Sequence, residues 1–337
     1  MGKLYSFVLI GCGEISRRHA AQIKQYGIIR AVCDTNRQKA NEAAAQYHAK
    51  AYYDIADMLQ SEEDVDVGVV CTPNGLHAMH TIASLEHGMH VLCEKPMAIT
   101  VKDARDMQQA AIAGNRKLFV VKQNRYNPPV AELKKIIGEN RLGAISGFQI
   151  NCFWNRPRSY YLNSWRGTKA LDGGILFTQF SHFIDLLYWL LGDVKNIQAI
   201  GRNYQHQDCI EFEDTGIVQL EMQSGAIGSL HFTINSFQCN MEGSITLFGE
   251  KGTVKIGGQY LNILEYQRIK DYPVQPLPQS KGANEYGLYT GSMSNHDKVY
   301  ENLLKSLDGK AHDAVMAEDG IKTVEIIEQI YAGMQTH

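Results

Sequence analysis

Gly11, Gly13 and Ser16 have the spacing of a turn that can receive a diphosphate. They follow an apolar run at 7–10 and lead into a helical pattern at 15–26. Gly11 permits a sharp turn, Gly13 lacks the Cβ that would keep a ligand from the backbone, and Ser16 lets helix and strand pack closely. The helix start would offer N–H groups and its positive dipole end to the diphosphate. Alone, the motif also fits an ordinary strand-to-helix turn.

Asp34 supplies a second element of the same chemistry. It ends the second apolar run, 23 residues after Gly11, where a dinucleotide-binding fold places an acid for the adenosine ribose hydroxyls. A helix-capping or loop aspartate is the alternative, and the glycine turn favours the ribose. A carboxylate there repels a ribose phosphate, so we expect NAD rather than NADP, although Arg37 could neutralise such a phosphate.

Two later apolar runs end in polar loops at 71–77 and 93–96. The ligand crevice of an open α/β sheet lies outside the carboxyl ends of its strands, so we expect both loops beside the glycine turn. Lys95, followed by Pro96, would present a cation on a stiffened backbone; a solvated loop lysine is an equal alternative. Pro96 also admits a cis peptide bond.

A largely apolar helical run, 175–191, carries a single polar stripe. A buried helix with such a stripe needs a partner for it, either a wet cleft with a substrate or a core contact that satisfies the histidine. The preceding Gly173 and Gly174 favour a ligand that approaches the helix start closely. The stripe comprises Thr178, His182, Asp185 and Trp189.

Three arginines lie among aromatic residues at 154–166. They could hold an anionic, ring-bearing substrate by bidentate contacts and stacking. A surface or subunit-contact edge is an equal alternative. The three are Arg156, Arg158 and Arg166.

Short apolar runs alternate with helical patterns over residues 1–123, which predicts a doubly wound parallel sheet with strands covered on both faces. The expected strands are 5–10, 28–33, 65–71, 90–93 and 117–122, and the expected helices 15–26, 37–47, 75–87 and 101–113. A proline pair, Pro128–Pro129, ends the pattern, so we predict an NAD-binding Rossmann domain at 1–125 and a substrate-binding and oligomerisation domain at 126–337.

The second domain should be α+β with a large, mainly antiparallel sheet, because its strand-like stretches alternate polar and apolar residues. We expect a long loop at 272–291. The expected strands are 145–154, 195–203, 214–223, 226–235, 243–249 and 252–257, and the expected helices 129–139, 175–191, 292–308 and 317–334.

Composition argues against binding to nucleic acid or a membrane and against a metal site. A net charge of −3 gives no electrostatic case for nucleic acid or an anionic membrane, and no apolar run is long enough to span a bilayer. The seven cysteines are scattered without a C-x-x-C pair, which indicates reduced thiols and no metal site. The start lacks the pattern of a signal peptide, so we expect a cytoplasmic protein.

Taken together, these motifs resemble the glucose–fructose oxidoreductase/inositol dehydrogenase (Gfo/Idh/MocA) family over nearly the whole chain. The resemblance implies nicotinamide-dependent oxidation of a sugar or cyclitol hydroxyl, with Lys95 and His182 catalytic, and a dimer or tetramer built through the C-terminal sheet. It also implies cofactor binding by Gly11, Gly13, Glu14, Ile15, Asp34, Thr72, Pro73, Asn74, His77, Glu94 and Lys95.

Thr178 departs from the aspartate that family sugar dehydrogenases often have four residues before the histidine. The segments 124–128 and 178–182 instead look like the UDP-N-acetylglucosaminuronate dehydrogenase branch, which oxidises the sugar C3 hydroxyl to a ketone for surface polysaccharide. The resemblance assigns substrate binding to Arg156, Arg158, Arg166, Asn124, Tyr126, Thr178, Gln179 and Asp185. The alternatives are a dehydrogenase of a free sugar or inositol, an NAD-using glycosidase, and a non-catalytic dinucleotide-sensing regulator, which need not keep Lys95 and His182.

Overall fold

The computed structural model describes residues 3–279, 282–287 and 289–335, which form two compact units. The first unit comprises Met1–Val121 and His296–Val324, and the second comprises Lys122–Asn295 and Glu325–His337, within those described residues. The division is discontinuous, whereas the sequence prediction drew one boundary after residue 125.

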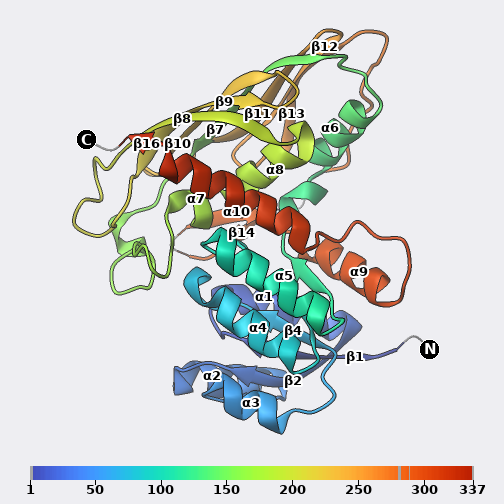
Figure 1. The fold of residues 1–337 in the computed structure, drawn as a ribbon, viewed down its shortest axis with the longest axis vertical. Helices are drawn as coiled ribbons and strands as arrows, with labels where there is room; N and C mark the ends of the chain where they lie inside the picture. The colour runs from blue at the N-terminus through green and yellow to red at the C-terminus, as the bar shows by residue number, and fades with distance from the viewer. Residues whose placement is uncertain (1–2, 280–281, 288, 336–337) are drawn as a thin grey trace. The chain divides into compact units, whose positions relative to one another are not determined.

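A six-stranded parallel sheet forms the centre of the first unit (Figure 1). Its order, β3-β2-β1-β4-β5-β6, is that of the dinucleotide-binding fold, with the order reversing between β1 and β4. The central strands are fully buried, as their apolar runs predict. The strands are β1 Tyr5–Ile10, β2 Gly27–Cys33, β3 Lys50–Tyr52, β4 Val67–Val70, β5 His90–Cys93 and β6 Leu118–Val120.

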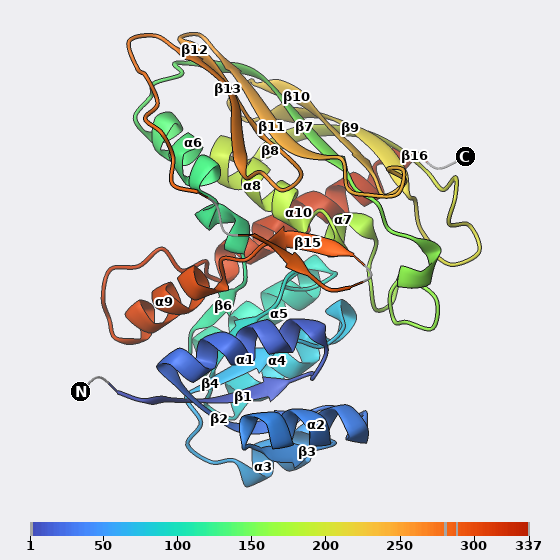
Figure 2. The same cartoon turned by 180° about the vertical axis from the view of Figure 1, so that it is seen from behind.

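Helices cover both faces of this sheet. One face carries α4 and α5 (Figure 1), and α1 and α9 pack together on the other (Figure 2). Asn36, Asp54 and Thr100 cap α2, α3 and α5 by accepting hydrogen bonds from first-turn N–H groups. The helices are α1 Glu14–Tyr26, α2 Arg37–Tyr47, α3 Ile55–Ser61, the 3-10 turn η1 Asn74–Leu76, α4 His77–Glu86, α5 Val101–Ala113 and α9 His296–Leu307. The last helix, α10 Ala317–Ala332, begins in this unit and ends in the second.

The second unit contains an eight-stranded mixed sheet in the order β13-β12-β11-β7-β10-β9-β8-β16. Its pairs are antiparallel except β7 with β10 and β8 with β16, so the predicted, mainly antiparallel sheet is confirmed. The strands are β7 Ile145–Phe153, β8 Val194–Arg202, β9 Thr215–Met222, β10 Ile227–Thr233, β11 Glu242–Gly249, β12 Gly252–Gly257, β13 Ile263–Ile269 and β16 Met334–Gln335.

Two helices, α6 Pro128–Gly138 and α8 Ser181–Leu191, cover one face of this sheet (Figure 1). Alternate strand residues point toward them, as in Val218, Leu220 and Met222 of β9, and all three are buried. Phe180 packs against Phe232 of β10, with ring centroids 6.2 Å apart. The remaining elements are the 3-10 turns η2 Gln123–Tyr126 and η3 Arg158–Tyr160, the helix α7 Ile175–Thr178 and the hairpin β14 Ala283–Glu285 with β15 Thr290–Met293.

Three features differ from the sequence prediction. The expected helix at 175–191 is two helices, α7 and α8, with a break at Gln179–Phe180. The expected loop at 272–291 contains β14 and the start of β15, while its positions 280, 281 and 288 lie outside the described residues. The short strand β3, the helix α3 and the strands β13 and β16 were not predicted.

In the part of the chain that the structure describes, no helix is both long enough and apolar enough to cross a membrane.

Candidate active site

The glycine turn joins β1 to α1; it is tightly packed at Gly11 and open at Gly13. Gly11 has a φ of +94°, and a Cβ there would lie 2.8 Å from the Cys71 carbonyl, so this position requires glycine. Around Gly13, by contrast, no described atom lies within 4 Å of a Cβ position. Ser16, buried in α1, donates from Oγ to the Gly13 carbonyl at 2.7 Å. The turn is therefore held from within and leaves the backbone at Gly13 approachable, as a diphosphate requires.

The start of α1 is exposed beside this turn. Glu14 is exposed and Ile15 half-buried, and the first N–H groups of a helix have no acceptor within it. No described side chain caps this helix. The geometry thus fits an anion at the α1 N-terminus.

The Asp34 carboxylate accepts a hydrogen bond from the glycine turn and is partly exposed to solvent. Its Oδ2 accepts from the Cys12 N–H at 2.8 Å and its Oδ1 from the Asn36 N–H at 2.8 Å. The side chain is half-buried, and each carboxylate oxygen keeps a further lone pair for a ribose hydroxyl. Arg37 lies over the ring of Tyr53, 4.4 Å from its centroid.

His77 links the two polar loops that follow β4 and β5. Its Nδ1 lies 2.6 Å from the Pro96 carbonyl and its Nε2 lies 2.9 Å from the Thr72 carbonyl. Pro73 is half-buried, Asn74 is buried, and the Lys95–Pro96 peptide bond is cis. Both loops therefore contact the His77 ring, which donates to one of the two carbonyls when neutral and to both when protonated.

Glu94 is anchored in the interior of the first unit. Its Oε1 accepts from His19 Nε2 at 2.8 Å and its Oε2 accepts from the Lys95 N–H at 3.0 Å. Burial raises the pKa of Glu94, but hydrogen bonds and charge from His19 and His296 outweigh it and hold the pKa well below its ordinary value. Tyr300 donates to His19 Nδ1 at 3.0 Å, so a chain of hydrogen bonds fixes the backbone at half-buried Lys95.

His19, Glu94 and His296 are also residue types that bind metals, and their candidate ligand atoms lie within 4.8 Å of one another. The 2.8 Å contact between His19 and Glu94 is a hydrogen bond, and all three side chains are buried. His296 Nε2 lies 3.7 Å from Glu94 Oε1, so the carboxylate faces both imidazole rings.

In the second unit, the polar stripe of α7 and α8 meets the segment before α6. Arg125 donates to both carboxylate oxygens of Asp185, at 2.9 and 2.7 Å, and Lys122 Nζ lies 3.5 Å from Asp185 Oδ1. Burial raises the pKa of Asp185, but the charges of Lys122 and Arg125 outweigh it and lower the pKa. Arg125 also lies over the ring of Trp189, 5.0 Å from its centroid. These contacts orient the helix that carries His182.

His182 itself is buried on α8, one turn from Asp185, and its positive charge would help lower the pKa of that carboxyl. Thr178 is half-buried, and it is the one residue from Gly174 to Leu187 that is not fully buried. Tyr126, at the end of η2, is also half-buried. The stripe is therefore half-buried at its two ends, Thr178 and Trp189, and buried at His182 and Asp185.

Several buried polar groups of the second unit have no hydrogen-bond partner among the described residues. They include the side-chain amide of Gln179, Asn124 Oδ1, the Tyr161 phenol and Arg156 Nε. Such groups are costly unless a ligand or water satisfies them. Those that belong to predicted site residues, Gln179, Asn124 and Arg156, are candidate contacts for a polar ligand.

The three arginines at 154–166 lie in different surroundings. Arg156 is buried and faces the rings of Trp154, Tyr160 and Tyr289, whereas exposed Arg158 pairs with Asp208. Half-buried Arg166 lies over the Tyr160 ring, 4.5 Å from its centroid. The structure thus brings Arg156 and Arg166 to one aromatic cluster and leaves Arg158 in a surface ion pair.

Sequence reasoning missed Asp172, which is fully buried just before Gly173. Its Oδ2 accepts from the Gly167 N–H at 2.8 Å, and its Oδ1 accepts from the Thr178 hydroxyl. Burial raises the pKa of Asp172 to about 6, against the opposing effect of these hydrogen bonds and of Arg166. Only the carboxylate next to the twin glycines could have signalled this position in the sequence.

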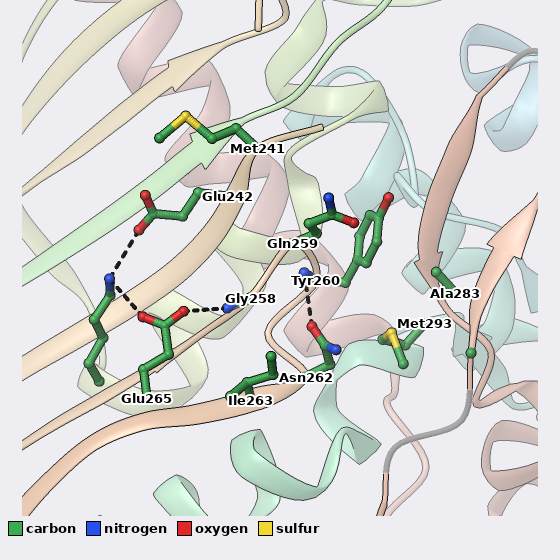
Figure 3. Close-up of a pocket in the computed structure, with 12 residues that line it drawn as sticks. Met241, Glu242, Gly258, Gln259, Tyr260, Asn262, Ile263, Glu265, Ala283 and Met293 are labelled. Carbon is green, nitrogen blue, oxygen red and sulfur yellow. Dashed lines mark hydrogen bonds and ion pairs between the residues drawn. The ribbon is translucent and has the colours of Figure 1, made fainter. Parts of the chain in front are cut away.

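A separate hollow of about 600 Å³ lies beside β12 and β13 (Figure 3). Lys255 reaches into it and pairs with Glu242 at 3.3 Å and with Glu265 at 2.8 Å. None of the predicted site residues lines it, and its charges are already paired. This hollow is therefore not the candidate site.

Comparisons with known proteins place the chain in a family. Residues 5–122 match the model described as "Oxidoreductase family, NAD-binding Rossmann fold", and residues 130–255 match the GFO/IDH/MocA C-terminal domain. The chain is 26% identical over 293 residues to the scyllo-inositol 2-dehydrogenase (NADP(+)) of Bacillus subtilis, covering 80% of this chain and 77% of that protein.

Two solved structures are similar over their whole length. The WlbA dehydrogenase of Bordetella pertussis, in complex with NADH and UDP-GlcNAcA, is 34% identical with a TM-score of 0.88, covering 98% of this chain and 96% of that one. The WlbA enzyme of Chromobacterium violaceum, with the same ligands, is also 34% identical with a TM-score of 0.88, covering 99% and 94%. The chain therefore belongs to the GFO/IDH/MocA family and is an NAD-dependent oxidoreductase.

Proposed function

We propose that this enzyme oxidises a secondary hydroxyl of a UDP-N-acetylhexosaminuronate, at sugar C3, to a ketone in surface-polysaccharide biosynthesis. The observation that carries the proposal is the 34% identity, over 98% of the chain, to a dehydrogenase whose structure holds NADH and UDP-GlcNAcA. The more distant relatives act on several classes of sugar and cyclitol, so the substrate follows from this similarity and from the polar groups of the second unit.

The cofactor site is proposed to be the open edge of the first unit. The residues fit a dinucleotide: Gly13 is approachable, Asp34 has lone pairs for a ribose, and α1 offers N–H groups. Bound NAD supplies the hydride acceptor. Thr72, Pro73 and Asn74 are proposed to line the nicotinamide end of the site, held by His77 and Glu94. Asp34→Ala should relax the preference for NAD over NADP by about tenfold, and an unchanged ratio of kcat/KM values would count against this role.

Proton transfer is proposed to rest on Lys95 and His182. Oxidation of a hydroxyl needs a base with a pKa near the working pH and a cation to stabilise the developing alkoxide. Buried His182 suits the base, since Asp185 beside it is fixed by Arg125, and the ammonium of Lys95 suits the cation. Asp185 then acts on His182 from the protein side instead of contacting substrate.

Substrate recognition is proposed to fall to the unsatisfied groups of the second unit. The amides of Gln179 and Asn124 can pair with sugar hydroxyl and acylamino groups, and Tyr126 and Thr178 are accessible beside them. Arg156 and Arg166, set among aromatic rings, suit a carboxylate or diphosphate. Arg158, paired with Asp208, would contribute only if substrate displaced that ion pair.

Oligomerisation through the larger sheet is proposed from its second face, which the helices leave uncovered. Apolar side chains are exposed along its strands, including Ile200, Ile217, Ile227 and Phe248. Ile200 and Ile217 are cross-strand partners, and they point away from the buried alternate residues. A second copy of the chain would cover them in a dimer or tetramer.

A second candidate function is oxidation of a free sugar or inositol, which the relative from Bacillus subtilis favours. A panel of UDP-sugars, free sugars and inositols, followed by NADH absorbance, separates the two. The proposal expects UDP-N-acetylhexosaminuronates to give the highest kcat/KM and the matched UDP-N-acetylhexosamines to react poorly. Turnover of inositols alone would overturn it. Release of free sugar without net NADH would indicate a glycosidase, and binding without turnover a regulator.

A further inference from the structure

Thr178 stands where sugar dehydrogenases of the family often have an aspartate, and its hydroxyl is hydrogen-bonded to the carboxylate of Asp172. Thr178 donates its hydroxyl hydrogen to Asp172 Oδ1, and the Asp172 carbonyl lies 3.3 Å from the same hydroxyl. The Gly167 N–H holds the other carboxylate oxygen at 2.8 Å. Asp172 is thus fixed between the loop that precedes it and the end of α7.

This arrangement determines the polarity of the Thr178 hydroxyl. A threonine hydroxyl has one hydrogen and two lone pairs, and an ionised carboxylate can only accept. The hydrogen therefore points inward to Asp172, and the Thr178 oxygen presents lone pairs outward. Thr178 is also half-buried, whereas His182 and Asp185 of the stripe are buried.

We infer that Asp172 is a positioning residue that fixes Thr178 as a hydrogen-bond acceptor, so that the substrate group meeting Thr178 is a donor, such as a hydroxyl or an acylamino N–H. The identity of that substrate rests on the proposed function, whereas the polarity of Thr178 does not. The inference adds a specificity element that favours a donor over an ether or keto oxygen.

Proton uptake by Asp172 would remove this constraint. Its carboxyl lies near the positive charge of Arg166, and its own charge acts on the phenols of Tyr161 and Tyr331. The pKa of Asp172, raised by burial to about 6, places the change within the working range of an enzyme. Below that pH a neutral carboxyl can donate to Thr178, whose hydrogen then turns outward. Substrate KM should rise as the pH falls through about 6.

Asp172→Asn is a sharp test because its amide would be oriented in advance. The Gly167 and Gly174 N–H groups donate to the carboxylate and need an acceptor, so we expect the amide oxygen to keep a backbone contact and the NH₂ group to face Thr178. The variant should therefore turn Thr178 into a donor. We expect an increase of about tenfold in sugar KM, a smaller change in kcat, an unchanged KM for NAD, and loss of the KM dependence on pH near 6.

Thr178→Val and Thr178→Ser test whether the Thr178 hydroxyl itself contacts the substrate. Valine should raise sugar KM by a similar factor, and serine should restore it to within about threefold, because it keeps the hydroxyl. Retention of wild-type KM and pH profile in Asp172→Asn, or failure of serine to restore binding, would overturn the inference. Circular dichroism and NADH binding confirm that each variant is folded.

Infrared spectroscopy separates this inference from the proposed function. The wild type should show a buried carboxyl band below pH 6 that is absent in Asp172→Asn and shifted in Thr178→Val. Absence of that band in the wild type, or its presence unchanged in both variants, would contradict the inference. Failure of the wild type to oxidise any UDP-sugar would overturn the proposed function alone, and the variants would then be assayed on the sugar that does react.

Discussion

The polar residues of the two units are satisfied in different ways. In the first unit the motif residues bond to one another: Asp34 to the glycine turn, His77 to two loop carbonyls, and Glu94 to His19. In the second unit the buried amides of Gln179 and Asn124 have atoms without partners in the described chain. The side chains of the proposed cofactor site thus hydrogen-bond within the protein, whereas the proposed substrate site keeps polar groups whose hydrogen bonds a substrate can make.

Loss of the two proposed catalytic side chains should have the largest effect, and one lies in each unit. Lys95→Ala and His182→Ala should each lower kcat by about 10²–10⁴-fold, because proton transfer and charge stabilisation are removed. Steady-state NADH production measures this. Exposed Lys102 and exposed His87 provide matched control variants, which should keep wild-type turnover. Near-normal turnover in both site variants would refute the assignment.

Removing one side chain from the hydrogen-bonded motif residues of the first unit should destabilise the protein. His19→Ala would leave the Glu94 carboxylate buried without its 2.8 Å donor, which should lower the free energy of unfolding by about 3 kcal/mol at neutral pH. Urea denaturation measures the change, with His87→Ala as the control.

The pH dependence of that variant has a defined sign. The pKa of Glu94 is depressed in the folded protein, so its contribution to stability is present above its unfolded pKa and is lost as the pH falls through its folded value. His19→Ala should raise the folded pKa and so begin this loss at a higher pH. An unchanged acid limb would show that His19 does not hold the carboxylate ionised.

Asp172 in the second unit should behave in the opposite direction. Its pKa rises from 3.8 to about 6 on folding, so ionisation opposes the folded state, and stability should decrease by about 3 kcal/mol between pH 4 and pH 7. Asp172→Asn should remove this decrease and be more stable than the wild type at pH 8. Urea denaturation across this range is the measurement, and equal pH slopes for both proteins would contradict it.

Gln179 should give the smallest effect on stability and the most direct contrast with His19. Gln179→Met removes an amide with no partner in the described chain, so the free energy of unfolding should be unchanged or higher by about 1 kcal/mol. Sugar KM should rise by about tenfold, since the substrate loses a partner. Exposed Gln109→Met on α5 is the matched control for both readouts. A destabilised variant with normal KM would show that Gln179 is structural.

The first unit was largely predictable from the sequence because its apolar runs and glycine turn are local signals. Strand β1 and helix α2 have the predicted bounds, whereas β3 was missed because three residues at a sheet edge carry little pattern. The return of residues 296–324 to this unit depends on distant contacts, such as Val120 N–H to the Val315 carbonyl at 2.9 Å, which no local signal encodes.

In the second unit, the contacts of the polar side chains were less predictable from the sequence than the strands. The apolar pattern at 175–191 predicted one helix because it does not encode the break after Thr178. Asp185 was predicted from the stripe, but its partner Arg125 lies 60 positions away in the chain, so nothing in the sequence indicated this ion pair. Asp172 was missed because nothing in its sequence position distinguishes a fully buried carboxylate from one in a solvated turn.

We propose above that the enzyme transfers hydride from a UDP-linked N-acetylated sugar acid to NAD and leaves a ketone. The product of a reaction with UDP-N-acetylglucosaminuronate and NAD, measured by mass spectrometry alongside NADH absorbance, tests this most directly. We expect an intact nucleotide sugar lighter by two hydrogens, formed with one NADH for each sugar. An unchanged nucleotide sugar, or one cleaved without net NADH, would contradict it.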